Sequence, residues 1–148
     1  QILDDLIRGG YRDIVVLDWA PDKTDGIGGK IGPLDGLPVR YLAVKIVPPR
    51  LKGKTQEEVE RYAFENALRI RKQIESLLRS PPSALVINDI SIYIQAGDPQ
   101  PLQELIEAVP VVIANGYYGR FFGNDGLSRR ERARMDELRK IFDEVIEL

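Results

Sequence analysis

The chain has 148 residues, 30% of them charged, and a formal net charge of -2. It contains neither His nor Cys, which excludes Ser-His-Asp and Cys-His catalysis, zinc sites built on these residues, and disulfides. The small net charge gives no overall field that would favour nucleic acid or a membrane surface. Any reaction must therefore use carboxylates, Lys, Arg, hydroxyls, amides or a bound ion.

The length of the chain predicts one domain. No apolar run approaches the ~18 residues that indicate a membrane span, and no signal-peptide pattern opens the chain. We therefore expect a cytoplasmic protein without membrane association. The lack of Cys, the single Met and the excess of Arg over Lys lean toward a thermophilic source.

The first elements predict a helix followed by a strand. An amphipathic pattern over residues 2–7 ends at a glycine pair, residues 9–10, which predicts a helix end. Because no capping residue precedes this pattern, we expect it to be the back of a longer helix, with further chain upstream. Residues 14–17 form an apolar run that predicts a short buried strand, with Asp18 at its carboxyl end.

Residues 20–38 are rich in Gly and Pro and predict a long loop. Within it, the run GIGGK could form a backbone nest for phosphate, with Lys23 and Lys30 as the cations. The run does not fit the phosphate-loop pattern GxxxxGK[ST], because Ile31 follows Lys30. A flexible loop or hairpin arm is the favoured alternative.

Residues 39–47 predict a second strand, and the run Gly-Lys-Thr at 53–55 follows it. This run is similar to the end of a phosphate loop, but the carboxylates at 57–58 would oppose a phosphate at the helix start. Thr55 and Glu58 instead form a capping box, which is the favoured interpretation. Three basic side chains nearby could still form a mobile clamp: Arg50, Lys52 and Lys54.

A long amphipathic helix is predicted from Gln56 to about Arg79. The β-branched run that follows, ALVINDISIYI at residues 84–94, predicts the central strand of the sheet. Asp89 interrupts this strand, and a buried carboxylate must be paired. Asp89 is therefore either the anchor of a site or an acceptor for a neighbouring loop.

The remaining chain continues the alternation of helices and strands. Asp98 caps a short helix through Ala108, and residues 109–114 predict a strand that ends in Asn115. The last helix is predicted from Ser128, capped reciprocally with Glu131, to the end of the chain. The whole order predicts an α/β layered fold with a mainly parallel central sheet flanked by helices.

Polar side chains end or interrupt three of the predicted strands. Ligands bind outside the carboxyl ends of strands in such sheets, so these side chains are expected to converge on one edge. Asp18 and Asp89 would suit Mg²⁺, which takes one or two carboxylates together with phosphate oxygens. Asn115 and Tyr117 could read or stack a base. As the alternative, each Asp is a buried hydrogen-bond acceptor and Asn115 is a turn residue.

The run ALVIND resembles the Walker B strand of P-loop NTPases. The segment IVVLDWAPDKTDGIGGK is similar in placement to the second strand and following loop of the branch that includes the MinD-like ATPases and the signal-recognition GTPases. The resemblance implies a domain that binds ATP or GTP with Mg²⁺, with Asp18 and Asp89 as metal ligands and catalytic carboxylates.

The chain departs from that family in two places. No GxxxxGK[ST] occurs in it, and the residues at 115–118, NGYY, are not the NKxD that would imply guanine specificity. We therefore expect a phosphate loop upstream of Gln1, and little or no hydrolysis by these residues alone.

The competing hypothesis is a non-enzymatic interaction module. The loop at 117–122 carries four aromatic residues and Arg120, and the last helix begins with an Arg-rich stretch at 129–134. These residues could stack and pair with single-stranded nucleic acid, or contact a protein partner or a second copy of the chain.

Overall fold

The computed structural model describes residues 1–23, 29–118 and 126–148. Four strands in these residues form one parallel sheet in the order β2-β1-β3-β4. The strands are β1 (Ile14–Asp18), β2 (Arg40–Ala43), β3 (Ala84–Asn88) and β4 (Val111–Ala114). The helices are α1 (Ile2–Arg8), α2 (Pro49–Lys52), α3 (Gln56–Arg79), α4 (Ser91–Ile94), α5 (Pro99–Ala108) and α6 (Gly126–Arg139). The predicted α/β layered fold with a parallel sheet is confirmed.

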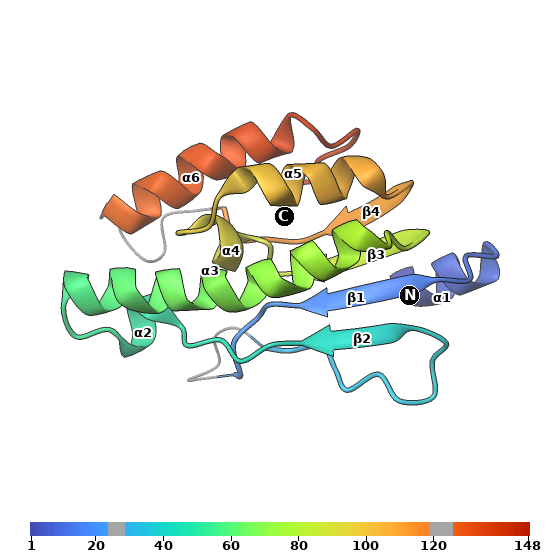
Figure 1. Ribbon diagram of the computed structural model, residues 1–148, viewed down its shortest axis with the longest axis horizontal. Coiled ribbons are helices and arrows are strands. Elements are labelled where there is room, and N and C mark those ends of the chain that lie inside the picture. The colour runs from blue at the N-terminus through green and yellow to red at the C-terminus, as the bar shows by residue number, and fades with distance from the viewer. Residues whose placement is uncertain (24–28, 119–125) are drawn as a thin grey trace.

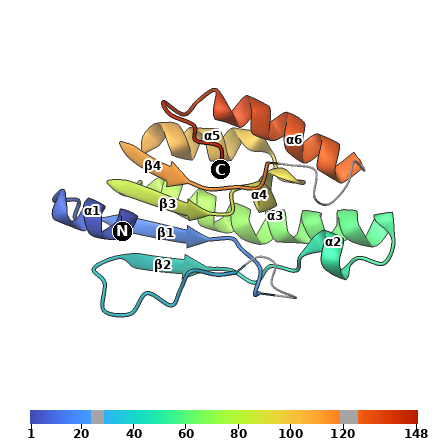
Figure 2. The same ribbon diagram turned by 180° about the vertical axis from the view of Figure 1, so that it is seen from behind.

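The two faces of the sheet are covered differently. α3 and α5 lie over one face (Figure 1), and the view from behind shows the strands in front of α3 (Figure 2), while α6 lies beyond β4 in both views. The larger apolar core forms between the sheet and this helical layer. It includes Leu17, Leu85, Ile87, Ile70, Ile74, Leu102 and Leu105. On the opposite face, Leu6 of α1 packs with Ile14 and Ala84 in a smaller cluster.

The crossovers explain this unequal covering. From β2 to β3 and from β3 to β4 the chain moves in the same direction across the sheet, through α3 and then α5. Right-handed crossovers in one direction place both helices on the same face. From β1 to β2 the chain moves in the opposite direction, and no helix occurs in the described part of this connection.

The start of α3 confirms the predicted capping box. Thr55 Oγ1 accepts a hydrogen bond from Glu58 N at 3.1 Å, and Glu58 Oε2 accepts one from Lys54 N at 2.6 Å. Both bonds satisfy amide groups that would otherwise have no partner at a helix start. The Gly-Lys-Thr run at 53–55 is therefore used for helix capping.

Replacing Thr55 with Ala should lower the free energy of unfolding by about 1 kcal/mol, because the Glu58 amide loses its acceptor. Urea denaturation would measure the change. A Thr55→Ser variant keeps the hydroxyl and serves as the control. Equal losses in the two variants would show that the hydroxyl does not carry the effect.

The structure corrects two predicted boundaries. The central strand was expected to reach Ile94, but it ends at Asn88 and the chain enters α4. Asp89 turns the chain there with a φ of 65°. The last helix was expected to reach the chain end from Ser128, but α6 runs from Gly126 to Arg139. Its final turn tightens into i to i−3 hydrogen bonds at residues 140–142, which ends the helix.

Two further strands are shorter than predicted, since β2 covers only four of residues 39–47 and β4 begins at Val111. Among the described helices, none combines the length and apolar character that crossing a membrane would require.

Candidate functional site

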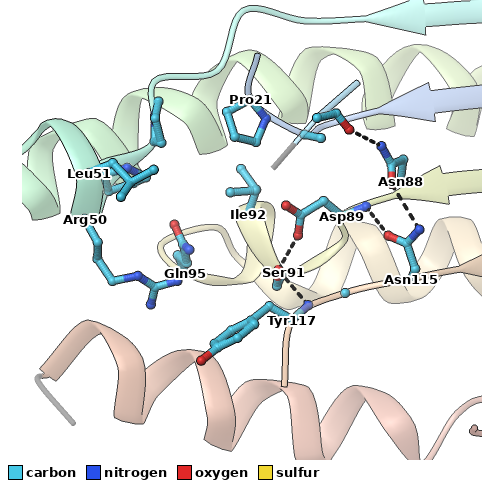
Figure 3. Close-up of a pocket in the computed structure, with 15 residues that line it drawn as sticks. Pro21, Arg50, Leu51, Asn88, Asp89, Ser91, Ile92, Gln95, Asn115 and Tyr117 are labelled. Carbon is cyan, nitrogen blue, oxygen red and sulfur yellow. Dashed lines mark hydrogen bonds between the residues drawn. The ribbon is translucent and has the colours of Figure 1, made fainter. Parts of the chain in front are cut away.

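A pocket of about 330 Å³ opens at the carboxyl edge of the sheet (Figure 3). Its walls come from the segments that follow β1, β3 and β4, and from α2. The lining residues are Ala20, Pro21, Gly29, Pro48, Pro49, Arg50, Leu51, Asn88, Asp89, Ser91, Ile92, Gln95, Asn115, Gly116 and Tyr117. The chain leaves β1 toward one side of the sheet and later returns to pair β3 on the other side. This pocket therefore lies beside the topological switch point, where open α/β sheets bind ligands.

A chain of side-chain amides joins the three strand ends. Asn88 Nδ2 donates to Asp18 Oδ1 at 2.9 Å, and Asn115 Nδ2 donates to Asn88 Oδ1 at 3.0 Å. Asn115 Oδ1 in turn accepts a hydrogen bond from Asp89 N at 2.7 Å. Both ends of the Asn115 amide therefore have protein partners, an arrangement that fits the turn-residue alternative better than base reading.

Asp18 is buried with 0% of its surface exposed. Its Oδ2 accepts hydrogen bonds from Tyr41 Oη at 2.6 Å and from Ile31 N at 2.7 Å, while Asn88 and Ala20 N donate to Oδ1. Burial alone would raise the pKa of Asp18, but these bonds and the charge of Lys30 outweigh it and lower the pKa below its usual value.

The Asp18 carboxylate therefore serves as an acceptor that fastens the loop after β1. With both oxygens held by protein donors, it does not fit a direct metal ligand. Burial and the bond to Asp18 also raise the pKa of Tyr41 to about 12.

The two predicted cations of the loop lie in different environments. Lys30 Nζ donates to the carbonyl oxygens of Ala20 at 2.5 Å, Val44 at 2.9 Å and Asp18 at 3.4 Å. It thus joins the ends of β1 and β2. Lys23 is exposed and is not among the residues that line the pocket. Residues 26–28 of the predicted GIGGK nest lie outside the described residues.

Of the predicted site residues, Asp89, Asn115 and Tyr117 line the pocket, and Asp89 is the predicted carboxylate among them. Its carboxylate points into the cavity (Figure 3) and accepts a hydrogen bond from the Ser91 hydroxyl. Burial raises the pKa of Asp89, opposed by the Ser91 bond and the charge of Arg50. Its φ of 65° lies in the left-handed region, which Asp and Asn adopt more readily than other side chains. Such backbone strain concentrates at functional sites.

A buried ion pair closes the opposite wall. Arg50 Nη2 lies 3.3 Å from Glu131 Oε2, with 12% and 3% of the two side chains exposed. Arg50 Nη1 also donates to Ser128 Oγ at 3.1 Å, and the guanidinium lies 5.8 Å from the centre of the Tyr117 ring. Gln95 Nε2 donates to the same Glu131 oxygen at 2.6 Å. Arg50 was expected in a mobile clamp, but three groups hold it in place.

Burial raises the pKa of Glu131, while Arg50 and Gln95 act to lower it. The sequence predicts only a capping role for Glu131 and no site role for Ser91 or Gln95. These two polar residues stand in an otherwise apolar stretch, which is the one local signal that could have drawn attention to them.

Two arginines in the Arg-rich start of α6, Arg130 and Arg134, form hydrogen bonds with other parts of the protein. Arg130 donates to Glu60 Oε2 and to the Gln95 carbonyl, both at 2.6 Å. Arg134 donates to the carbonyls of Ile94 and Gly97. These bonds tie α6 to the end of α4. The predicted aromatic and basic residues Arg120, Phe121 and Phe122 lie outside the described residues, so the nucleic-acid hypothesis stays a prediction.

Among the described residues that line the pocket, Asp89 is the carboxylate that could hold Mg²⁺, since protein donors occupy both oxygens of Asp18. No group of three or more acidic residues in the described ranges is placed to hold a metal ion. Comparison with protein-family models, with curated proteins and with solved structures gives no match for this chain.

Proposed function

We propose that this chain is a nucleotide-binding α/β domain of the P-loop NTPase type, which takes a nucleoside triphosphate with Mg²⁺ in the strand-end pocket. The observation that carries the proposal is the position of the pocket at the switch point of a parallel sheet. The resemblance of the strands ending at Asp18 and Asn88 to those of P-loop NTPases supports the same assignment. The pocket volume of about 330 Å³ is in the range of small-ligand sites.

The lining residues divide the pocket into a polar and an apolar part. Asp89 supplies the carboxylate that would hold Mg²⁺, whose remaining ligands would be water and phosphate oxygens. Leu51, Ile92 and Pro21 supply apolar surface for a base. Asp18 acts as a positioning residue, because Asn88 connects its carboxylate to Asn115 and so to the Asp89 amide.

The proposal concerns binding rather than turnover. Among the described residues that line the pocket, Arg50 is the one cationic side chain, and Glu131 already pairs with it. The described residues would therefore do little to neutralise the negative charge that develops on the phosphate during hydrolysis. Hydrolysis in this chain is expected to be slow or undetectable, as the lack of a GxxxxGK[ST] run also predicts.

Replacing Asp89 with Asn should weaken Mg²⁺-dependent nucleotide binding by roughly tenfold or more, because the metal loses its charged ligand. Asn tolerates the left-handed backbone at this position, so the fold should persist. The measurement is an NMR titration of the chain with ATP or GTP at fixed Mg²⁺, which also detects millimolar affinities. Because burial raises the pKa of Asp89, wild-type affinity should rise with pH through that pKa.

The matched control is Asp35→Asn, an exposed carboxylate outside the pocket. This variant should bind as the wild type does. If neither nucleotide shifts resonances of the pocket residues at any Mg²⁺ concentration, the proposed function is wrong. If Asp89→Asn binds as tightly as the wild type, nucleotide binding stands and the role of Asp89 is withdrawn.

A further inference from the structure

The Gln95 side chain carries an acceptor without a partner. It is buried with 1% of its surface exposed, and its Oε1 has no hydrogen-bond partner in the part of the chain that the structure describes. Buried polar atoms in folded proteins are nearly always paired, so an exception requires an explanation. Gln95 is also one of the residues that line the strand-end pocket.

The orientation of this amide is fixed by its neighbour. Glu131 Oε2 accepts hydrogen bonds from Gln95 Nε2 at 2.6 Å and from Arg50 Nη2 at 3.3 Å. Turning the amide over would set a carbonyl oxygen against a carboxylate, which is unfavourable. Oε1 must therefore face away from Glu131. Figure 3 shows it turned from Arg50 toward the cavity, on the side of Leu51 and Ile92.

The surroundings of Oε1 define what it would bind. Pro21, Leu51 and Ile92 give the pocket apolar walls. An acceptor inside apolar walls favours a flat apolar group that carries a single N–H donor at its edge. Arg50 and the Gln95 Nε2 group, the nearby donors, already bond to Glu131.

We infer that this part of the pocket selects adenine, with the 6-amino group of the base donating to Gln95 Oε1. The inference rests on the proposed nucleotide-binding function and adds the identity of the base. A base with an oxygen at position 6, such as hypoxanthine or guanine, would place an acceptor against Oε1 in the same orientation. A site that offers an unpaired polar group discriminates strongly between such analogues.

The test compares three triphosphates that differ at position 6 of the purine, where the 6-oxo base also carries a proton on N1. ATP carries an amino group there, purine riboside triphosphate carries hydrogen, and inosine triphosphate carries oxygen. NMR titration at fixed Mg²⁺ should show ATP binding roughly tenfold more tightly than purine riboside triphosphate, the effect of about one net hydrogen bond. Inosine triphosphate should bind most weakly. The Gln95 side-chain amide resonances should shift with ATP and much less with the other two.

A Gln95→Met variant keeps the side-chain length and removes the acceptor. It should bind ATP as weakly as purine riboside triphosphate, while its affinity for purine riboside triphosphate should match the wild type. The control is Gln100→Met, because Gln100 is an exposed residue on α5 whose amide also donates to a Glu. This control should keep the full preference for ATP. The comparison of the three ligands with the wild type does not depend on the variant folding.

The outcomes separate this inference from the function on which it rests. If the three triphosphates bind the wild type equally, or if Gln95→Met weakens all three alike, base selection by Gln95 is overturned while nucleotide binding stands. Equal binding would also be the result if a water molecule satisfies Oε1. If no purine triphosphate binds at all, both the function and the inference fail.

Discussion

An Asp18→Asn variant is expected to lose about 3 kcal/mol of unfolding free energy at pH 7, the scale of hydrogen bonds to a buried charged group. Each oxygen of the carboxylate accepts from two protein donors. An Asn side chain has one oxygen and one NH₂ group, so the NH₂ group takes the place of one of the two carboxylate oxygens. It then faces either Ile31 N or the Asn88 amide, and both of these are donors. Whichever way it turns, at least one buried donor is left facing another donor.

The pH dependence of this loss has a definite sign. The pKa of Asp18 is lowered in the folded protein, so its contribution is present above the pKa of the unfolded state, roughly 3.9. The contribution is lost as the pH falls through the lower, folded-state pKa. The difference between wild type and variant should therefore be largest near neutral pH and shrink in acid. Urea denaturation at pH 7 and pH 3 would measure it.

Asp13→Asn is the matched control for Asp18→Asn. Asp13 pairs with Arg40, but about half of each side chain is exposed, at 49% and 53%. Exposed pairs contribute about 0 to 1 kcal/mol, so this control should lose little at either pH. Equal stability of Asp18→Asn and the wild type at pH 7 would show that the loop does not depend on the carboxylate.

A Glu131→Ala variant should be destabilised by about 3 to 5 kcal/mol, the cost of removing one partner of a buried ion pair. The substitution leaves the Arg50 guanidinium, which is 12% exposed, without its carboxylate. It also leaves the Gln95 amide without its acceptor. Denaturant titration would give the loss. The expected mechanism is an uncompensated buried charge rather than lost packing.

A double variant distinguishes those mechanisms. Replacing both Arg50 and Glu131 with Met removes the charges together and should recover much of the loss. Glu137→Ala, on the same helix, removes an exposed carboxylate that pairs with Lys140 and should change stability little. If the double variant is as unstable as Glu131→Ala, the charge of Arg50 is not the cause.

Helix starts that are determined by residues nearby in the sequence were predictable. The capping residues Thr55 and Asp98 fix the starts of α3 and α5, and both side chains accept the expected amide bonds. Their apolar stripes identify the helix faces that enter the core. A helix cap acts within three residues of the chain, so no tertiary information is needed.

The end of the central strand was not predictable in the same way. Residues 90–94 are apolar and β-branched, and they are buried in α4 just as they would be in a strand. Periodicity does not separate a short buried helix from a buried strand. The deciding feature is the positive φ of Asp89, whose amide donates a hydrogen bond to the distant residue Asn115.

The same difference between local and distant determinants applies to the candidate site. The sequence placed Asp18 and Asn115 at strand ends and put Asp89 on the same edge. Whether a carboxylate is free or occupied depends on partners far away in the chain. Tyr41 lies 23 residues from Asp18, and Glu131 lies 36 residues from Gln95. No local pattern in the sequence identifies such pairs, so the sequence predicts a metal ligand at Asp18 and no site role for Gln95.

No helix occurs in the described part of the connection between β1 and β2. The corner of the fold formed by residues 29–43 therefore lacks the helical covering that stabilises the rest of the sheet. β2 is an edge strand with half-buried or exposed side chains, and residues 29–43 are held by the pairing of β2 with β1 and by the polar contacts of Lys30, Arg40 and Tyr41. Its apolar side chains Val39 and Leu42 are only partly buried against the two apolar clusters, so detaching this corner would uncover less apolar surface than opening β3, which lies in the main core. We therefore expect this corner to open as a separate unit of local unfolding, which would remove the pocket wall at Gly29 while the rest of the sheet stays folded.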